Sequence, residues 1–98
     1  MRKITKEMVN AFNNNLPFKK DNTKVIHANN QTLILLHGNL IAVKNTKDGF
    51  LMIQNCGWFT NTTKERLNAL PNVSICQRKG KWFLNGNEWN GEFITIQN

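Results

Sequence analysis

The apolar residues at the start of the chain are spaced as on one face of a helix. They fall at i, i+4, i+7 and i+8, namely Ile4, Met8, Ala11 and Phe12. This spacing predicts an amphipathic helix of about ten residues that starts at Thr5 or a neighbour. Pro17 disfavours helical geometry at Leu16, so we expect the helix to end among the asparagines at 13–15 and a polar linker to follow.

From Lys24 onward the hydrophobic period changes to two, which is typical of strands. Four such segments follow one another, at 25–28, 32–37, 40–44 and 50–54. The residues between them, Asn29-Asn30-Gln31, Gly38-Asn39 and Asp48-Gly49, are common in hairpin turns. The pattern therefore predicts a four-strand antiparallel meander.

The segment 62–70 has the start signal of a short helix. Thr62 and Glu65 fit the capping box, in which each side chain accepts a hydrogen bond from the backbone amide of the other residue. Leu67 and Leu70 are expected to face the core. The side chains expected toward solvent or the helix margin are those of Lys64, Arg66 and Asn68.

Three further strand segments follow at 73–77, 82–84 and 93–96, with turn signals at Asn85-Gly86 and Asn90-Gly91, and they predict a second, three-strand meander. The order of helices and strands indicates an α+β fold. We expect a single domain over 1–98, with an N-terminal helix and linker at 1–23 and a strand-rich core at 24–98 that contains the inserted helix 62–70. A barrel, one curved sheet and two small sheets are all compatible with this pattern.

Composition adds a strong positive charge. The formal net charge is +7 and the pI about 9.9, which favours an acidic partner: nucleic acid, an anionic membrane surface or an acidic protein face. No apolar run approaches the roughly 18 residues of a membrane span, so no membrane partner is expected. Cys56 and Cys76 are 20 residues apart and fit no metal or disulfide motif, which predicts reduced thiols in a cytoplasmic protein.

The start of the 62–70 helix has two interpretations. Capping explains Thr62 and Glu65 but leaves Lys64 in the first turn, where a cation is mildly unfavourable. A phosphate held by the helix amides, Thr60, Thr63 and Lys64 would explain that cation. Both interpretations, a cap alone and an anion site, remain open.

The tryptophans are similarly ambiguous. Trp58 fits a lid on the core, a platform for a nucleobase or an anchor for a partner. Trp82 and Trp89 lie among basic residues, as in a groove for single strands, although the same spacing fits a half-buried hairpin. The basic residues nearby are Arg78, Lys79 and Lys81. They form one basic face with Lys64 and the N-terminal cations if the two helices pack together, and dispersed surface charges otherwise. These N-terminal cations are Arg2, Lys3, Lys6, Lys19, Lys20 and Lys24.

Catalysis has little support in the sequence. His27 and His37 have no partners at metal-ligand spacing, and Glu88 and Glu92 flank a turn where solvated carboxylates are expected. Cys56 could act as a nucleophile with a histidine, but any small domain with two cysteines and two histidines allows such a pair. We therefore expect no enzyme activity, no metal, no cofactor and no small-molecule substrate.

A dense set of residues resembles a family of small bacteriophage proteins of unknown function. The resemblance covers about 32–96 and rests on His37-Gly38-Asn39, Ile41-Ala42, Gly57-Trp58, Thr60, Thr62-Thr63-Lys64, Arg66-Leu67-Asn68, Leu70, Gly80-x-Trp82 and Asn85-Gly86-x-x-Trp89-x-Gly91. It implies a phage origin and a compact strand-rich domain, and it brings no established activity. Small basic phage proteins of this kind include stoichiometric inhibitors and adaptors, among them anti-CRISPR proteins.

The sequence thus favours a phage protein that binds RNA, DNA or a host defence nucleoprotein, most concretely an anti-CRISPR inhibitor of an RNA-guided nuclease in the host cytoplasm. The alternatives are an inhibitor or adaptor that binds only protein, and a small hydrolase. The residues predicted to contact nucleic acid or a partner are Trp58, Thr60, Thr63, Lys64, Arg66, Arg78, Lys79, Lys81 and Trp82.

Overall fold

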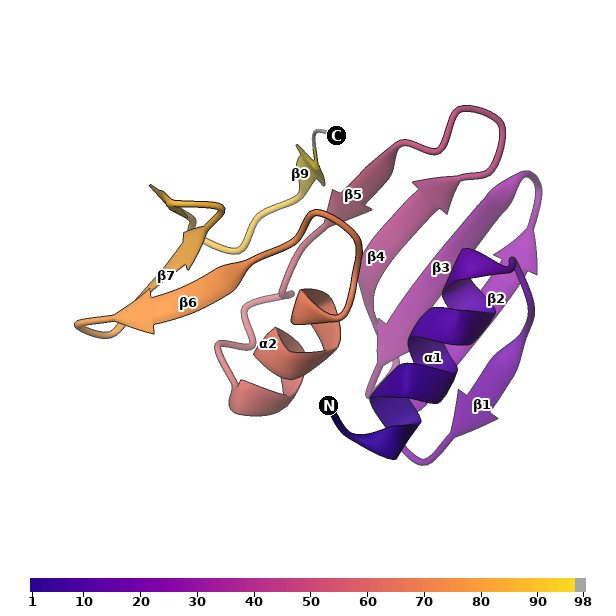
Figure 1. Cartoon of the computed structure of the whole chain (residues 1–98), viewed down its shortest axis with the longest axis horizontal. Helices are drawn as coiled ribbons and strands as arrows, with labels where there is room; N and C mark the ends of the chain where they lie inside the picture. Colours follow the sequence, from indigo (N-terminus) through magenta and orange to yellow (C-terminus); the bar gives the residue numbers. More distant parts are fainter. Residues whose placement is uncertain (97–98) are drawn as a thin grey trace.

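A computed structural model describes residues 1–96 and has the predicted α+β architecture, with two helices and two antiparallel sheets (Figure 1). The N-terminal helix, the four-strand meander, the short helix and a three-strand sheet follow in the predicted order. The elements are α1 (Lys3–Asn13), β1 (Phe18–Lys20), β2 (Thr23–Ala28), β3 (Gln31–Leu36), β4 (Asn39–Asn45), β5 (Leu51–Ile53), α2 (Asn61–Asn68), β6 (Ile75–Arg78), β7 (Lys81–Leu84), β8 (Asn87–Glu88) and β9 (Ile94–Ile96).

The larger sheet has the order β1-β2-β3-β4-β5-β9, and α1 lies across one of its faces (Figure 1). The predicted stripe of α1 is confirmed, because its four apolar residues are buried. Beneath the helix the strands present a row of cross-strand neighbours that are at most 1% exposed, namely Val25, Ile34, Ala42 and Ile53. Burial of these apolar side chains is the main force that holds α1 on the sheet.

The opposite face of this sheet is also apolar. Successive cross-strand neighbours on it are Ile26, Leu33, Val43 and Met52. The first three are partly exposed, and Met52 is 38% exposed. We call these four residues the outer row. A sheet face of this composition is normally covered by another element or by a partner.

Two parts of the strand prediction need correction. The segment after Pro17, predicted as linker, contains β1, which pairs with β2 because Phe18 packs against the core. The C-terminal strand does not join the second meander; β9 pairs with β5 in the larger sheet. The third strand of the small sheet is instead the two-residue β8, which follows the predicted Asn85-Gly86 turn.

The small sheet forms an arm at one end of the molecule. Strands β6 and β7 project away from the larger sheet and are joined at the tip by the Lys79-Gly80 turn (Figure 1). Helix α2 lies between this arm and α1 (Figure 1). The exposed cations of the hairpin are therefore carried away from the core.

Candidate nucleic-acid interface

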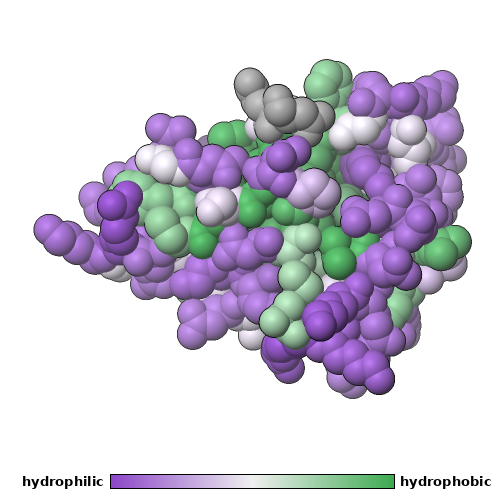
Figure 2. Space-filling model, viewed as in Figure 1, coloured by the Kyte–Doolittle hydropathy of each residue, from purple (hydrophilic) through white to green (hydrophobic). Residues whose placement is uncertain are grey.

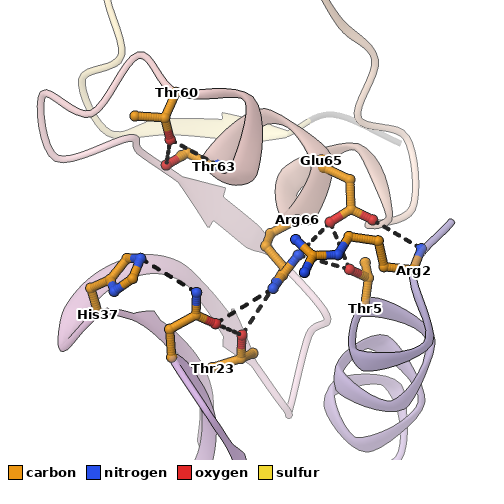
Figure 3. Close-up of polar contacts among 9 residues, drawn as sticks. Arg2, Thr5, Thr23, His37, Thr60, Thr63, Glu65 and Arg66 are labelled. Atoms are coloured by element: carbon orange, nitrogen blue, oxygen red, sulfur yellow. Dashed lines mark hydrogen bonds and ion pairs between the residues drawn. The ribbon is translucent and has the colours of Figure 1, made fainter.

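Helix α2 starts one residue before the predicted position, and a different threonine caps it. Thr60 has an extended backbone, and its Oγ1 accepts the Thr63 N–H at 3.1 Å and lies 2.9 Å from the Thr63 hydroxyl (Figure 3). The predicted Thr62–Glu65 capping box was wrong, because the Glu65 carboxylate turns toward α1. Thr60 and Thr63 therefore both have a structural role at the helix start.

Thr60→Ala is expected to lower the free energy of unfolding by about 1 kcal/mol, because it removes the acceptor for the Thr63 amide. Thr62→Ala, the matched control in the same turn, should change it by less than about 0.5 kcal/mol. Urea unfolding followed by circular dichroism measures both. A larger loss in Thr62→Ala would instead support the predicted capping box between Thr62 and Glu65.

Arg66 is not on the solvent side of α2 as predicted; its side chain is only 1% exposed. Its Nε donates to Thr23 Oγ1 at 3.2 Å, and its Nη1 donates to Thr5 Oγ1 at 3.0 Å and to the Glu65 carboxylate (Figure 3). The guanidinium thus joins α2 to both α1 and β2. A side chain held in this way is part of the scaffold and cannot reach a phosphate at the surface.

Two residues of this network, Thr5 and Thr23, were not recognised from the sequence. Thr5 had been placed at the start of the first helix, whereas it lies inside α1 and donates to Glu65 Oε1 at 2.7 Å. Thr23 had been assigned to a linker, whereas it starts β2 and is 1% exposed. Both threonines occupy positions that face the core, and this is the signal that could have identified them.

The Glu65 carboxylate is stabilised in its charged form. Burial alone raises its pKa, but hydrogen bonds from the Thr5 hydroxyl, the Arg66 guanidinium and the Arg2 amide, with the Arg66 charge, outweigh this effect and hold the pKa below its usual 4.5. A carboxylate whose pKa is lowered by folding adds stability above the unfolded pKa, and this stability is lost as the pH falls through the folded value.

We therefore expect the free energy of unfolding to fall as the pH is lowered from about 5 through the acid range, and to fall less steeply in Glu65→Gln. Urea titrations at several pH values measure the slope. An NMR titration of the Glu65 carboxyl carbon gives its folded pKa directly. Equal slopes in the two proteins would show that this network is not linked to protonation.

The tryptophans of the small sheet do not line a groove. Trp82 and Trp89 are 2% and 7% exposed, and their ring centroids lie 6.2 Å apart. Phe59 packs edge-on against Trp82 at 5.1 Å. The interpretation of Trp82 as a stacking platform was therefore wrong for this structure, because its ring is buried among other aromatic rings. Only Trp58 among the three is exposed, at 55%.

Four cations gather on and beside the projecting hairpin, and we call them the basic arm: Lys64, Arg78, Lys79 and Lys81. Lys64 Nζ reaches Gln77 Oε1 of β6 at 3.3 Å, which places it against the hairpin. The Arg78 guanidinium lies 4.5 Å from the centre of the Phe83 ring. Figure 2 shows that the tip of the hairpin, at the left of the view, is hydrophilic.

Negative charge on the basic arm is limited. Lys81 Nζ lies 3.8 Å from Glu88 Oε1, in an exposed ion pair that contributes little to stability. The remaining cations of the arm have no carboxylate within ion-pair distance among residues 1–96. The arm therefore keeps a net positive charge that is available to a partner.

A second group of cations lies on β1 and β2 at the other end of the molecule (Figure 1). Lys20 pairs with Glu7 at 3.2 Å, and Lys19 stands directly opposite Lys24 across the strands. Because these two groups lie at opposite ends, they do not form the single basic face that was one of the two alternatives. The basic arm carries most of the predicted contact residues that remain exposed.

A pocket of about 460 Å³ lies at the start of α2, beside the exposed Trp58 ring. Its walls come from the β3–β4 turn, the 55–58 turn and the first residues of α2. We call it the α2 pocket, and it is lined by Leu36, His37, Asn39, Ile41, Asn55, Trp58, Thr60, Thr62 and Thr63. Sequence reasoning missed Asn55, although an Asn two residues before a Gly is a signal for the side-chain turn that it forms.

Comparison with known proteins identifies the family of this chain. A family model described as the Kyanoviridae Gp96 protein matches residues 1–97. The chain belongs to the Kyanoviridae Gp96 family. Its membership confirms the predicted relation to small phage proteins and extends the match over α1, which the motif had left uncovered. No curated protein and no solved structure matches the chain.

The Cys56 thiol is one candidate nucleophile of this chain. The Cys56 thiol donates to the Leu40 carbonyl at 3.0 Å, and burial raises its pKa, which keeps it protonated at neutral pH. Within residues 1–96, no three side chains of the metal-binding types come together. Over the same range, neither helix has the length and apolar character needed to cross a bilayer.

Proposed function

We propose that this Kyanoviridae Gp96-family protein is a non-enzymatic phage protein that binds nucleic acid, or a host machine that carries nucleic acid, through its basic arm. In its most concrete form it inhibits an RNA-guided defence nuclease in the host cytoplasm. The observation that carries the proposal is the projecting hairpin, on which exposed cations outnumber carboxylates.

The geometry of the arm fits a phosphate backbone. Lysine and arginine side chains that neutralise phosphates release counterions, and this release supplies most of the affinity in binding without sequence preference. The hairpin is narrow, and its cations extend from the tip to Lys64 on α2. Arg78 is already stacked on an aromatic ring, which orders its guanidinium for contact with a phosphate or a base.

The test is the binding of fluorescent single- and double-stranded RNA and DNA at two salt concentrations. Reversal of three arm cations, Lys64→Glu, Arg78→Glu and Lys79→Glu, should weaken binding at least about tenfold and lower the salt dependence by about one ion per lost phosphate contact. Lys64→Glu also places a favourable charge in the first turn of α2, so the variant should remain folded.

The matched control reverses three exposed cations elsewhere: Lys19→Glu, Lys24→Glu and Lys47→Glu. It has the same formal net charge as the arm variant, so it separates a local site from a general charge effect. Equal losses in both variants, or no binding of any nucleic acid at low salt, would count against the arm as the site. Arg66 is left unchanged in both variants because its reversal would place an unpaired charge in the core.

The inhibitor form of the proposal has its own assay. Purified protein added to the host's RNA-guided nuclease should stop target cleavage at a near-stoichiometric ratio, and the arm variant should not. Cleavage at normal rates despite excess protein would reject this form while leaving nucleic-acid binding intact.

The outer row supports a second candidate, an inhibitor or adaptor that binds only protein. Four apolar side chains in register across β2–β5 form a surface suited to a partner's apolar residues. Capture of a host protein from nuclease-treated lysate should then survive in the arm variant and be lost in the double variant Leu33→Thr and Val43→Thr, which keeps strand propensity. The reverse pattern would favour the basic arm.

A further inference from the structure

One residue of the α2 pocket wall, Asn55, carries a buried donor that has no partner within residues 1–96. Asn55 is 1% exposed, and its Oδ1 accepts the Gly57 N–H at 2.9 Å. That bond fixes the orientation of the amide group, so its Nδ2 is a donor, and it has no partner among the described residues. Buried polar groups are nearly always paired, and an unpaired donor in a pocket wall fits a ligand that carries an acceptor.

The first turn of α2 adds donors beside the same pocket, which Thr60, Thr62 and Thr63 line and whose wall Asn61 adjoins in the chain. The Thr60 side chain and carbonyl accept the amides of Thr63 and Lys64, whereas the amides of Asn61 and Thr62 come too early in the helix for intrahelical partners. These two amides and the positive end of the helix dipole favour an anion. Within the described residues, no carboxylate lines the pocket to oppose it.

Trp58 supplies a flat apolar surface beside these donors. Its backbone N–H donates to the Asn55 carbonyl at 2.9 Å, so the turn that carries the orphan amide also positions the ring. The side chain lines the pocket and is 55% exposed. An exposed indole next to hydrogen-bond donors is the arrangement on which unpaired nucleobases stack.

We propose that the α2 pocket binds one nucleotide of a single strand, with the base stacked on Trp58, a base carbonyl oxygen at Asn55 Nδ2 and the phosphate at the start of α2. This inference rests on the proposed nucleic-acid binding and deepens it. A nucleotide is favoured over free phosphate because no lysine or arginine lines the pocket and because a pocket of about 460 Å³ with an aromatic wall is suited to a larger ligand.

NMR titration with the pentanucleotides rU5 and dT5 tests the inference. The expected result is a shift of the Asn55 side-chain amide and of the Trp58 indole N–H at low salt, with quenching of Trp58 fluorescence. The fluorescence is informative because Trp82 and Trp89 are buried. Inorganic phosphate alone should not reproduce the shifts, and full reproduction by phosphate would overturn the nucleotide assignment.

Two variants separate the parts of the site. Trp58→Leu should weaken pentanucleotide binding about tenfold through lost stacking, as is typical for one base. Asn61→Pro removes one amide donor at the first helical position, where proline is well tolerated and where the extended Thr60 backbone suits a following proline. It should weaken binding of rU5 and leave that of the nucleoside uridine, which carries no phosphate, unchanged.

The outcomes distinguish this inference from the proposed function. Binding that shifts only Arg78, Lys79 and Lys81 would overturn the pocket assignment and leave the basic arm supported. The absence of any binding at low salt would overturn both. Affinity that is unchanged in both pocket variants, while the arm variant loses it, would likewise reject the α2 pocket as a nucleotide site.

Discussion

Arg66→Ala is expected to lower the free energy of unfolding by about 3–5 kcal/mol, which is the loss typical when one partner of a buried ionic network is removed. The guanidinium donates to side chains on α1, α2 and β2, so its removal weakens contacts among three elements at once (Figure 3). The hydroxyls of Thr5 and Thr23 would each lose a donor at positions that are at most 1% exposed.

Three further variants divide this loss into its causes. Arg66→Met keeps most of the buried stem, so its smaller loss isolates the polar contacts. Arg66→Lys keeps the charge but has no planar fork, and it should recover only part of the stability. Lys64→Ala, two residues away on the partly exposed side of α2, should change stability by less than about 0.5 kcal/mol.

Urea unfolding of all four variants at pH 7 makes the comparison. A loss below about 1 kcal/mol in Arg66→Ala would show that water replaces the guanidinium at little cost. In that case Arg66 would be free to leave the network, and its prediction as a contact residue would regain support.

The spacing of residues along α2 indicates that Arg66 faces the core, although the prediction placed it toward solvent. Thr63, Arg66, Leu67 and Leu70 lie at i, i+3, i+4 and i+7, which is the spacing of a single inward stripe. Because two of the four are polar, only Leu67 and Leu70 were predicted to face the core. A buried arginine requires partners, and these come from α1 and β2, at positions that α2 alone does not specify.

The strand prediction failed where pairing is not local. The hairpins joining β2 to β5 follow from adjacent segments and short turns, and these were predicted correctly. Strand β9 pairs with β5 across about forty residues, and nothing in the segment 93–96 indicates its partner. Strand β1 has only three residues, two of them lysine, so it shows no alternation from which it could be recognised.

The sequence predicted the exposed cations of the basic arm but not the α2 pocket. Arg78, Lys79 and Lys81 were placed correctly on an exposed hairpin, because a Lys-Gly turn between alternating segments is a local signal. The α2 pocket is lined both by the β3–β4 turn and by Asn55, and Asn55 packs against Gly91, so it depends on segments far apart in sequence. Burial of a polar side chain by distant segments has no local pattern.

Gly91→Ala is expected to lower the free energy of unfolding by about 2–4 kcal/mol, from two additive causes. Gly91 has φ +89°, a conformation that alanine adopts only with strain. A Cβ built on it would lie 2.2 Å from Asn55 Oδ1, so the buried amide would have to move. The Gly91 carbonyl also accepts the Asn55 N–H at 2.9 Å, and this bond connects the segment leading to β9 with the end of β5.

Gly86→Ala is the matched control, because Gly86 has φ +91° and no atom within 4 Å of an added Cβ. Gly86→Ala should lower the free energy of unfolding only by the backbone strain, about 1 kcal/mol. Thermal or urea unfolding of the two variants measures the difference between their losses. Equal losses would mean that the Asn55 amide moves aside without cost, so packing would not hold its Nδ2 in place. A larger loss in Gly91→Ala would show that the contact with Gly91 fixes the amide, and the unpaired donor in the α2 pocket would then be a built feature of the fold.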